Sequence, residues 1–484
     1  MSKLKFGGSK DLTTGNPMKL ILNFGVPLLF GMLFQQFYNM ADTIIVGRTI
    51  SVEALAAVGA TGSISFLIVG FVQGVTSGFA VITAQRFGAG SENGVRRSVA
   101  TSIILGIAVT IVMTAISVLA ARPLLEIMKT PSDIIDDSYN YIIVIFEGIA
   151  AAVFFNLFSS ILRSLGDSKT PLVFLIIASI INIILDFVFI LTFKMGVAGA
   201  GWATVIAQFI SGILCFVYSL KKFPILRLTK HDWKFSWKFA WQHLEVGLPM
   251  AFQFSITAIG TMVIQSALNS LGSTAVAAFT AGSKIDQFAT QPLASLGVAV
   301  ATYTAQNYGA RELERIKKGV TGAAIIATVC GIVGGFVVIT FAKPLVALFV
   351  GSGQNEVMSL SKEYLVLNGV FYVILGLLFV YRNALQGIGS SMIAFFGGVW
   401  ELVMRSLVAF VLVSYLKFAA VCIASPVAWF GATIWLMIAY FIIINRIIKK
   451  QISLKLIIDI YLILQTLSFF DIMSSIFKKR EVLI

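Results

Sequence analysis

The chain has 484 residues, of which 58% are hydrophobic and only 12% are charged, and its mean hydropathy is +0.93. A soluble globular domain is about 45–50% apolar and ~25% charged, so this chain has too few charged residues to cover a water-facing surface. Soluble enzymes, secreted scaffolds and disordered chains are therefore excluded. The formal net charge of +14 could by itself suggest nucleic-acid binding, but the positions of the basic residues indicate otherwise.

Twelve apolar stretches follow one another along the chain, and each is long enough for a membrane helix, which needs about 20 apolar residues. Breaks rich in Gly, Asn, Ser and charged residues separate them, as is typical of short connections. The sequence therefore predicts an all-α integral membrane protein. Its twelve spans are expected near residues 20–46, 54–82, 98–120, 138–160, 172–193, 197–220, 241–269, 275–304, 319–341, 364–383, 392–415 and 419–444.

The loops on the two sides of this arrangement differ in their content of Lys and Arg. One side holds 23 of these residues, with Arg382 among them, whereas the other side holds seven. Cytoplasmic loops carry the excess of Lys and Arg, so both ends of the twelve-span core, and with them the N-terminus, are predicted to be cytoplasmic. We therefore expect a multi-pass protein of the cell (plasma or inner) membrane whose partner is the lipid bilayer, with no nucleic acid.

Residues 452–470 form one further apolar stretch, which Lys455 and Asp459 interrupt. A thirteenth span there would place the basic residues at 478–480 outside, against the positive-inside rule. We expect the tail, residues 451–484, to form a cytoplasmic or interfacial helix. A true span and an appendage without a role in function are the alternatives.

An internal repeat relates the two halves of the chain. TAQRFGA at 83–89 returns as TAQNYGA at 304–310, and LRSLGDS at 162–168 returns as LQGIGSS at 385–391. Six spans per repeat is an even number, so both halves have the same orientation, and two lobes around a central cavity are expected, as in secondary transporters. The predicted parts are an N-terminal lobe (1–220), a cytoplasmic linker (221–240), a C-terminal lobe (241–450) and the tail (451–484).

Four segments carry a resemblance to a known family. They are GNPMKLILNFGVPLLFGMLFQQFYNMADTIIVG in the first span, LRSLGDSKTPL after the fourth, NIILDFVFI in the fifth and GVAGAGWATVIAQ in the sixth. Together with the duplicated plan they resemble the MATE (multidrug and toxic compound extrusion) family, most closely its bacterial DinF-like branch, over about residues 11–448. The resemblance implies export of cationic, amphiphilic drugs in exchange for H⁺ or Na⁺. It implies no use of ATP, and no G-x-x-x-x-G-K-[ST] motif occurs.

The resemblance also implies a cation-coupling site at Asp42, Asn182, Asp186 and Thr204. Asn182 and Asp186 lie one turn apart on the same helical face. Carboxylate, amide and hydroxyl oxygens suit a hard cation such as Na⁺, and two neighbouring carboxylates could instead share a proton. An ionisable group at mid-membrane costs about 2.5–3.5 kcal/mol, so each Asp needs a partner or a purpose. The structural alternative is that Asp42 braces a helix and Asp186 only bonds Asn182.

Other polar residues inside the spans are candidates for contact with substrate. We expect a cavity lined by Gln35, Tyr38, Asn39, Asn156, Gln253 and Asp286. Some MATE branches place a Glu in the seventh span and an Asp in the tenth, whereas here the stretch GLPMAFQFSITAIGT of the seventh span and the tenth span contain no acidic residue, so coupling through the second lobe is in doubt. For Asp286, an intramembrane salt bridge is the alternative to a substrate role.

Two further features concern the helices themselves. Pro27 and Pro249 occupy equivalent positions in the two repeats, and a proline inside a helix removes an N–H and bends the helix. Bending of the first span could couple Asp42 to the cavity, with a static kink as the alternative. Glu401 and Arg405 are one turn apart in the eleventh span, so we expect them to form a bracing pair.

The expected partners are small organic cations, with H⁺ or Na⁺ as coupling ion, no other cofactor and a monomeric protein. The alternative function is a flippase for lipid-linked oligosaccharides. An anionic pyrophosphate substrate would favour several basic residues in the cavity, whereas the spans offer mainly Lys284 and Arg405. An enzyme is not expected because no H-E-x-x-H, G-x-S-x-G or Cys–His pairing occurs.

Overall fold

The computed structural model describes residues 11–350 and 354–481, with side chains described as far as Ser453 except at residues 52, 349 and 350. Within these residues the regular structure is entirely helical. The α-helices are α1 (Pro17–Thr49), α2 (Val52–Ala60), α3 (Gly62–Gly88), α4 (Glu92–Ile127), α5 (Ile135–Glu147), α6 (Ile149–Ser164), α7 (Lys169–Phe187), α8 (Gly196–Lys222), α9 (Trp237–Asn269), α10 (Ser273–Gly309), α11 (Leu313–Thr340), α12 (Ala342–Val350), α13 (Asn355–Gly369), α14 (Tyr372–Ile388), α15 (Ser391–Leu407), α16 (Val413–Leu416) and α17 (Phe418–Glu481).

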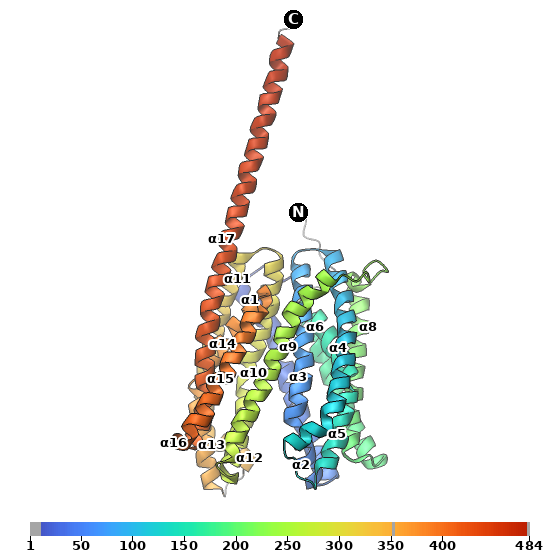
Figure 1. The fold of residues 1–484 in the computed structure, drawn as a ribbon, viewed down its shortest axis with the longest axis vertical. Coiled ribbons are helices and arrows are strands. Elements are labelled where there is room, and N and C mark those ends of the chain that lie inside the picture. The colour runs from blue at the N-terminus through green and yellow to red at the C-terminus, as the bar shows by residue number, and fades with distance from the viewer. Residues whose placement is uncertain (1–10, 351–353, 482–484) are drawn as a thin grey trace. The chain divides into compact units, whose positions relative to one another are not determined.

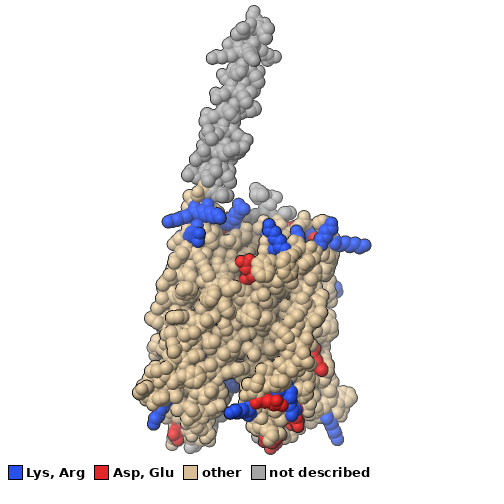
Figure 2. Space-filling view, viewed as in Figure 1, with Lys and Arg blue, Asp and Glu red and all other residues tan. Residues whose placement is uncertain are grey.

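Each of the twelve predicted spans coincides with one helix or with a broken helix, so the all-α membrane architecture is confirmed. Among the described residues, nine helices are long and apolar enough to cross a membrane, and two bent pairs raise this number to eleven. The remaining predicted span, the eighth, is the 37-residue helix α10, which carries Lys284 and Asp286. Lys and Arg gather at the two ends of the helices, and the belt between them is nearly free of charge on the face that Figure 2 shows.

The fourth span of each repeat is broken rather than continuous. The axes of α5 and α6 differ by 47°, and those of α13 and α14 differ by 49°. The first break falls at Gly148, where an added Cβ would collide with the side chain of Val205 on α8. Only glycine therefore lets the fourth and sixth spans pack this closely at the bend.

Contacts divide the chain into two compact units, Met1–Met437 and Ile438–Ile484, with the boundary inside α17. α17 itself is one helix of 64 residues. Its helical structure extends through the predicted tail as far as Glu481, whereas the position of the tail relative to a membrane remains a prediction.

Within the first unit, the helices of the first repeat, blue to green in Figure 1, lie beside those of the second repeat, yellow to orange. α3 and α9 pack along each other and join the two repeats. A Cβ added at Gly74 would lie 2.6 Å from the Cα of Ala251, and one added at Gly78 would meet the backbone of Gly247. Small residues let these two backbones touch, as is common where membrane helices pack.

A pair of equivalent hydrogen bonds joins the repeats at the end that the charge count predicts to be cytoplasmic. Gln85 Nε2 donates to the carbonyl oxygen of Gly387 at 2.9 Å, and Gln306 Nε2 donates to that of Ser164 at 2.8 Å. The two glutamines hold the same position in TAQRFGA and TAQNYGA, and the two acceptors hold the same position in LRSLGDS and LQGIGSS. We call these four residues the glutamine latch.

The backbones beside the latch are in equally close contact. A Cβ added at Gly88 would overlap the carbonyl oxygen of Gln306, and one added at Gly309 would overlap that of Gln85. Glycine is thus required at the same position of both repeats. The repeated sequence motif is explained by a repeated contact between the two repeats.

Candidate functional site

Three helices of the first repeat, α1, α7 and α8, bring the four predicted cation-site residues to a similar depth. Asp42 lies seven residues before the end of α1, Asp186 one residue before the end of α7, and Thr204 eight residues after the start of α8. At 1.5 Å per residue, Asp42 and Thr204 are about 10–12 Å from the helix ends that the charge count predicts to be outside. A π-helix, Val188–Thr192, begins two residues after Asp186, and such segments are frequent at functional sites.

The side chains of this cluster are buried and poorly satisfied. Asp42, Asn182, Asp186 and Thr204 expose 8%, 1%, 0% and 9% of their surface. The two carboxyl groups lie beside each other, and Asn182 Nδ2 donates to Thr204 Oγ1 at 3.4 Å. One oxygen of Asp42, the oxygen of Asn182 and both oxygens of Asp186 accept no hydrogen bond from the described residues. The structure thus brings all four predicted residues together, with buried acceptor oxygens that have no donor among the described residues.

Two tyrosines complete the cluster. Tyr38, one turn before Asp42, lies beside Thr204, and Tyr141 on α5 lies close to both aspartates. Tyr38 was predicted as a cavity residue, whereas Tyr141 was not predicted. Nothing in the local sequence marks Tyr141, because its place depends on how α5 packs against α8.

A polar face of α1 connects the cluster to the surface. Gln35, Tyr38, Asn39 and Asp42 follow the i, i+3, i+4, i+7 spacing of one helical face. Gln35 and Asn39 are exposed, Tyr38 is half-buried and Asp42 is buried. This face therefore gives a polar path from the surface to the carboxylates.

The other predicted cavity residues do not join this cluster. Asn156 is half-buried and donates to the carbonyl of Ala152 in its own helix at 2.9 Å. Gln253 is buried and accepts a hydrogen bond of 2.7 Å from Gln386 on α14. Asp286 accepts a hydrogen bond of 2.6 Å from the Tyr372 hydroxyl; none of the ion pairs seen among the described residues includes it.

The two prolines predicted to bend helices lie inside long helices. Pro27 is in α1 and Pro249 is in α9, and both helices continue past them. Their role in bending remains a prediction.

A buried charge cluster in the second repeat corrects one expectation. Arg382, counted above among the cytoplasmic loop residues, is buried in α14, because that helix continues to Ile388. Its guanidinium forms the closest ion pair with Glu401 on α15, while Arg405 lies 4.0 Å from the same carboxylate. The expected contact between Glu401 and Arg405 is present, but Glu401 chiefly neutralises Arg382.

The cluster around Asp42 offers oxygen ligands only. No group of three or more His, Cys, Asp or Glu side chains suited to a resident metal ion occurs in the part of the chain that the structure describes. Two carboxylates, one amide and one hydroxyl form a donor set that matches an exchangeable hard cation or a shared proton.

Comparison with known proteins agrees with this arrangement. The probable multidrug resistance protein YpnP of Bacillus subtilis is 28% identical over 386 residues, which cover 79% of this chain and 85% of that protein. The probable multidrug resistance protein NorM of Thermotoga maritima is 25% identical over 82% of this chain and 86% of its own length.

The fold is also that of solved transporters. A structure described as the outward-facing conformation of a multidrug resistance MATE family transporter of the MOP superfamily superposes with a TM-score of 0.85 and 26% identity, covering 91% of this chain and 99% of that one. The MatE family model matches the chain twice, over residues 27–188 and 249–411, once in each repeat. The chain is therefore a multi-pass membrane protein that belongs to the MatE family of transporters.

Proposed function

We propose that this protein is a cation-coupled antiporter that exports cationic, amphiphilic drugs and toxic compounds by alternating access. The observation that carries the proposal is the pair of adjacent, buried carboxylates, Asp42 and Asp186, with acceptor oxygens that lack a donor. Unsatisfied ionisable groups within a membrane are costly, so they favour a bound cation. The names of the relatives, which describe multidrug resistance proteins, support this substrate class.

Coupling follows from competition for the same negative charge. A proton or Na⁺ entering from outside neutralises the carboxylates, and a bound organic cation then loses its electrostatic partner. Gln35 and Asn39, on the exposed part of the same face of α1 and further than Asp42 from its predicted outer end, supply polar contacts for the substrate beside the carboxylates. One pH unit supplies about 1.4 kcal/mol per proton, which corresponds to a tenfold accumulation ratio.

Alternating access requires an end of the protein that can open. The glutamine latch and the glycines beside it close the predicted cytoplasmic end, so we assign this structure to the outward-facing state of the cycle. In the state that takes up substrate from the cytoplasm, these contacts are broken. The flippase alternative gains no support from Arg382 and Arg405, because both lie against Glu401.

Transport in proteoliposomes tests this proposal. The purified protein is reconstituted in vesicles loaded with ethidium, and a pH gradient and a sodium gradient are imposed in turn. We expect one gradient to drive efflux, and Asp42→Asn and Asp186→Asn to abolish the driven component. Asp133→Asn, in an exposed loop, is the matched control and retains it. Undiminished efflux by folded Asp42→Asn would refute the coupling site, and no response of the wild type to either gradient would refute antiport.

A further inference from the structure

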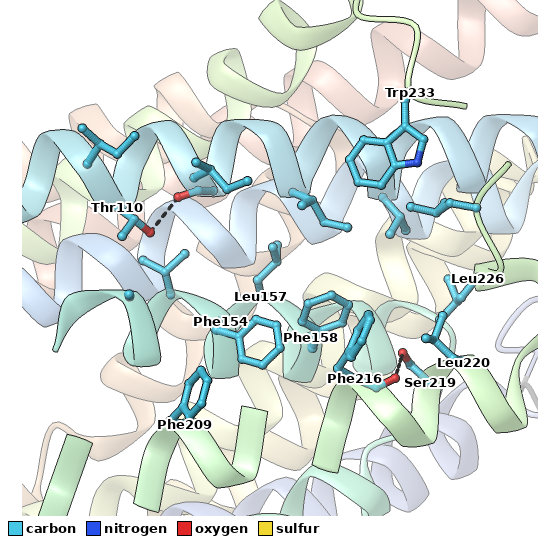
Figure 3. Close-up of a pocket in the computed structure, with 18 residues that line it drawn as sticks. Thr110, Phe154, Leu157, Phe158, Phe209, Phe216, Ser219, Leu220, Leu226 and Trp233 are labelled. Carbon is cyan, nitrogen blue, oxygen red and sulfur yellow. Dashed lines mark hydrogen bonds between the residues drawn. The ribbon is translucent and has the colours of Figure 1, made fainter. Parts of the chain in front are cut away.

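A second cavity lies in the first repeat, outside the cation site. This space of about 660 Å³ opens between α4 and α8, with α6 behind it, and we call it the lateral groove (Figure 3). Leu157 and Phe158 of α6 are buried, whereas Ile107 and Ile111 of α4 and Phe209 of α8 are at least half exposed. The groove therefore has a buried floor and an open side.

The length of the groove is close to the thickness of one leaflet. Its lining on α4 runs from Val99 to Ile111, a rise of about 18 Å at 1.5 Å per residue. Half of a hydrocarbon core of about 30 Å is roughly 15 Å. Since α4 begins at the predicted cytoplasmic end, the groove matches the depth of the cytoplasmic leaflet.

The wall of the groove offers no anionic side chain and no free hydroxyl to a polar ligand. No Asp or Glu lines it, and its two hydroxyls already have acceptors in their own helices. Thr110 Oγ1 donates to the carbonyl of Gly106 at 2.9 Å, and Ser219 Oγ donates to that of Phe216 at 2.7 Å (Figure 3). The remaining surface is aliphatic and aromatic, so the chemistry that fits is a hydrocarbon chain.

At its predicted cytoplasmic end, the groove meets residues that are typical of the membrane surface. The segment after α8 covers it with Leu226, Leu228 and Trp233, and Trp is typical of the membrane interface. Arg227 lies between the two leucines, and its Nε donates to the carbonyl of Leu220, which also lines the groove, at 3.2 Å. This bond holds an exposed guanidinium at the mouth of the groove.

Other cations lie near Arg227 in the sequence. Lys221 and Lys222 at the end of α8 and Lys230 and Lys234 in the segment after it are all exposed. Clusters of Lys and Arg at this depth favour anionic lipid headgroups, by about 1 kcal/mol per residue, or about fivefold in affinity.

We propose that the lateral groove binds one anionic phospholipid of the cytoplasmic leaflet. An acyl chain lies along α6 between α4 and α8, and the phosphate contacts Arg227 with the lysines beside it. The site is separate from Asp42 and Asp186, so it does not depend on the proposed transport reaction.

Photolabelling of the full-length protein in nanodiscs tests this site without any ion gradient. The probe is phosphatidylglycerol with a diazirine in its acyl chain, and the labelled peptides are mapped by mass spectrometry. We expect labels on the groove-lining residues of α4, α6 and α8. Ile103→Trp and Ala150→Trp, which fill the groove, reduce these labels to the level of other lipid-facing helices, while Ile116→Trp, on the exposed face of α4 outside the groove, does not.

The headgroup is tested separately. Arg227→Gln weakens labelling by the phosphatidylglycerol probe about fivefold and leaves labelling by a matching phosphatidylcholine probe unchanged. Lys362→Gln, an exposed lysine in α13, changes neither. Labels spread evenly over the lipid-facing helices of the wild type, or labels that persist in both folded groove-filling variants, would overturn the proposal. Equal labelling by the two probes in the wild type would overturn the choice of an anionic lipid.

Discussion

Replacing Gly88 with alanine tests how the predicted cytoplasmic end is closed. The added Cβ overlaps the backbone carbonyl of Gln306, which cannot rotate away as a flexible side chain could. The ends of α3 and α10 must separate, and the two latch hydrogen bonds of 2.9 and 2.8 Å are lost. Each such bond contributes about 0.5–1.5 kcal/mol net, so closure weakens by about 1–3 kcal/mol, a shift of about 5–150-fold in a two-state equilibrium.

Distance measurements by electron–electron double resonance report this shift. Spin labels are placed at Asn93 and Glu314, in the first turns of α4 and α11, after the three native cysteines have been replaced. The wild type is expected to show one short distance, and Gly88→Ala an added longer population. Gly62→Ala is the matched control on α3, because its Cβ meets no atom within 4 Å.

Gly309, the counterpart of Gly88 in the second repeat, provides an independent check. Gly309→Ala should produce the same longer population, and the double variant should exceed either single variant only slightly, because each change alone opens the latch. A folded Gly88→Ala protein with the distance distribution of the wild type would refute the assignment of the latch.

Three further predictions concern stability. Glu401→Gln leaves two buried arginines without a counter-charge and should lower the free energy of unfolding by about 3–5 kcal/mol, which thermal unfolding will detect. Gly148→Ala should lower the free energy of unfolding by about 1–3 kcal/mol through overpacking. The same assay should show that Val205→Ala, which removes the colliding methyl groups, restores stability. Burial opposes ionisation of Asp232, but hydrogen bonds from the amide and hydroxyl of Thr229, both 2.7 Å, prevail and lower its pKa. Ionised Asp232 therefore stabilises the folded state at neutral pH, and this stabilisation is lost as the pH falls below about 3.9. The hydrogen-exchange protection factor of the Thr229 amide should fall there, and it should already be low at pH 7 in Asp232→Ala.

The sequence by itself was sufficient for the helices and for one pair of the buried cluster. The lengths of the apolar stretches located the spans. The spacing of four residues between Asn182 and Asp186 placed both on one face of a helix. The association of these two residues with Asp42 and Thr204 came from the family resemblance, because nothing in the chain by itself relates positions on three different helices.

The remaining features depend on contacts between distant segments. Tyr141 joins the cluster through the packing of α5 on α8. Arg382 was counted with a loop because it lies at the end of the tenth predicted span, whereas α14 continues to Ile388. The repeated TAQ motif was recognised as a sign of duplication, but its hydrogen bonds connect residues more than 140 positions apart. The breaks at Gly148 and near Gly369 likewise follow from close neighbours rather than from the local sequence.

The glutamine latch bears on how such a chain could arise. Each repeat contributes one donor side chain and one acceptor carbonyl, so each surface complements a copy of itself. In a symmetric dimer this property defines an isologous interface. Two identical half-length chains could form the same pair of bonds, and fusion of their genes would preserve a contact that already existed. The later divergence of the halves, with paired carboxylates in one and a neutralised arginine pair in the other, left that contact in place.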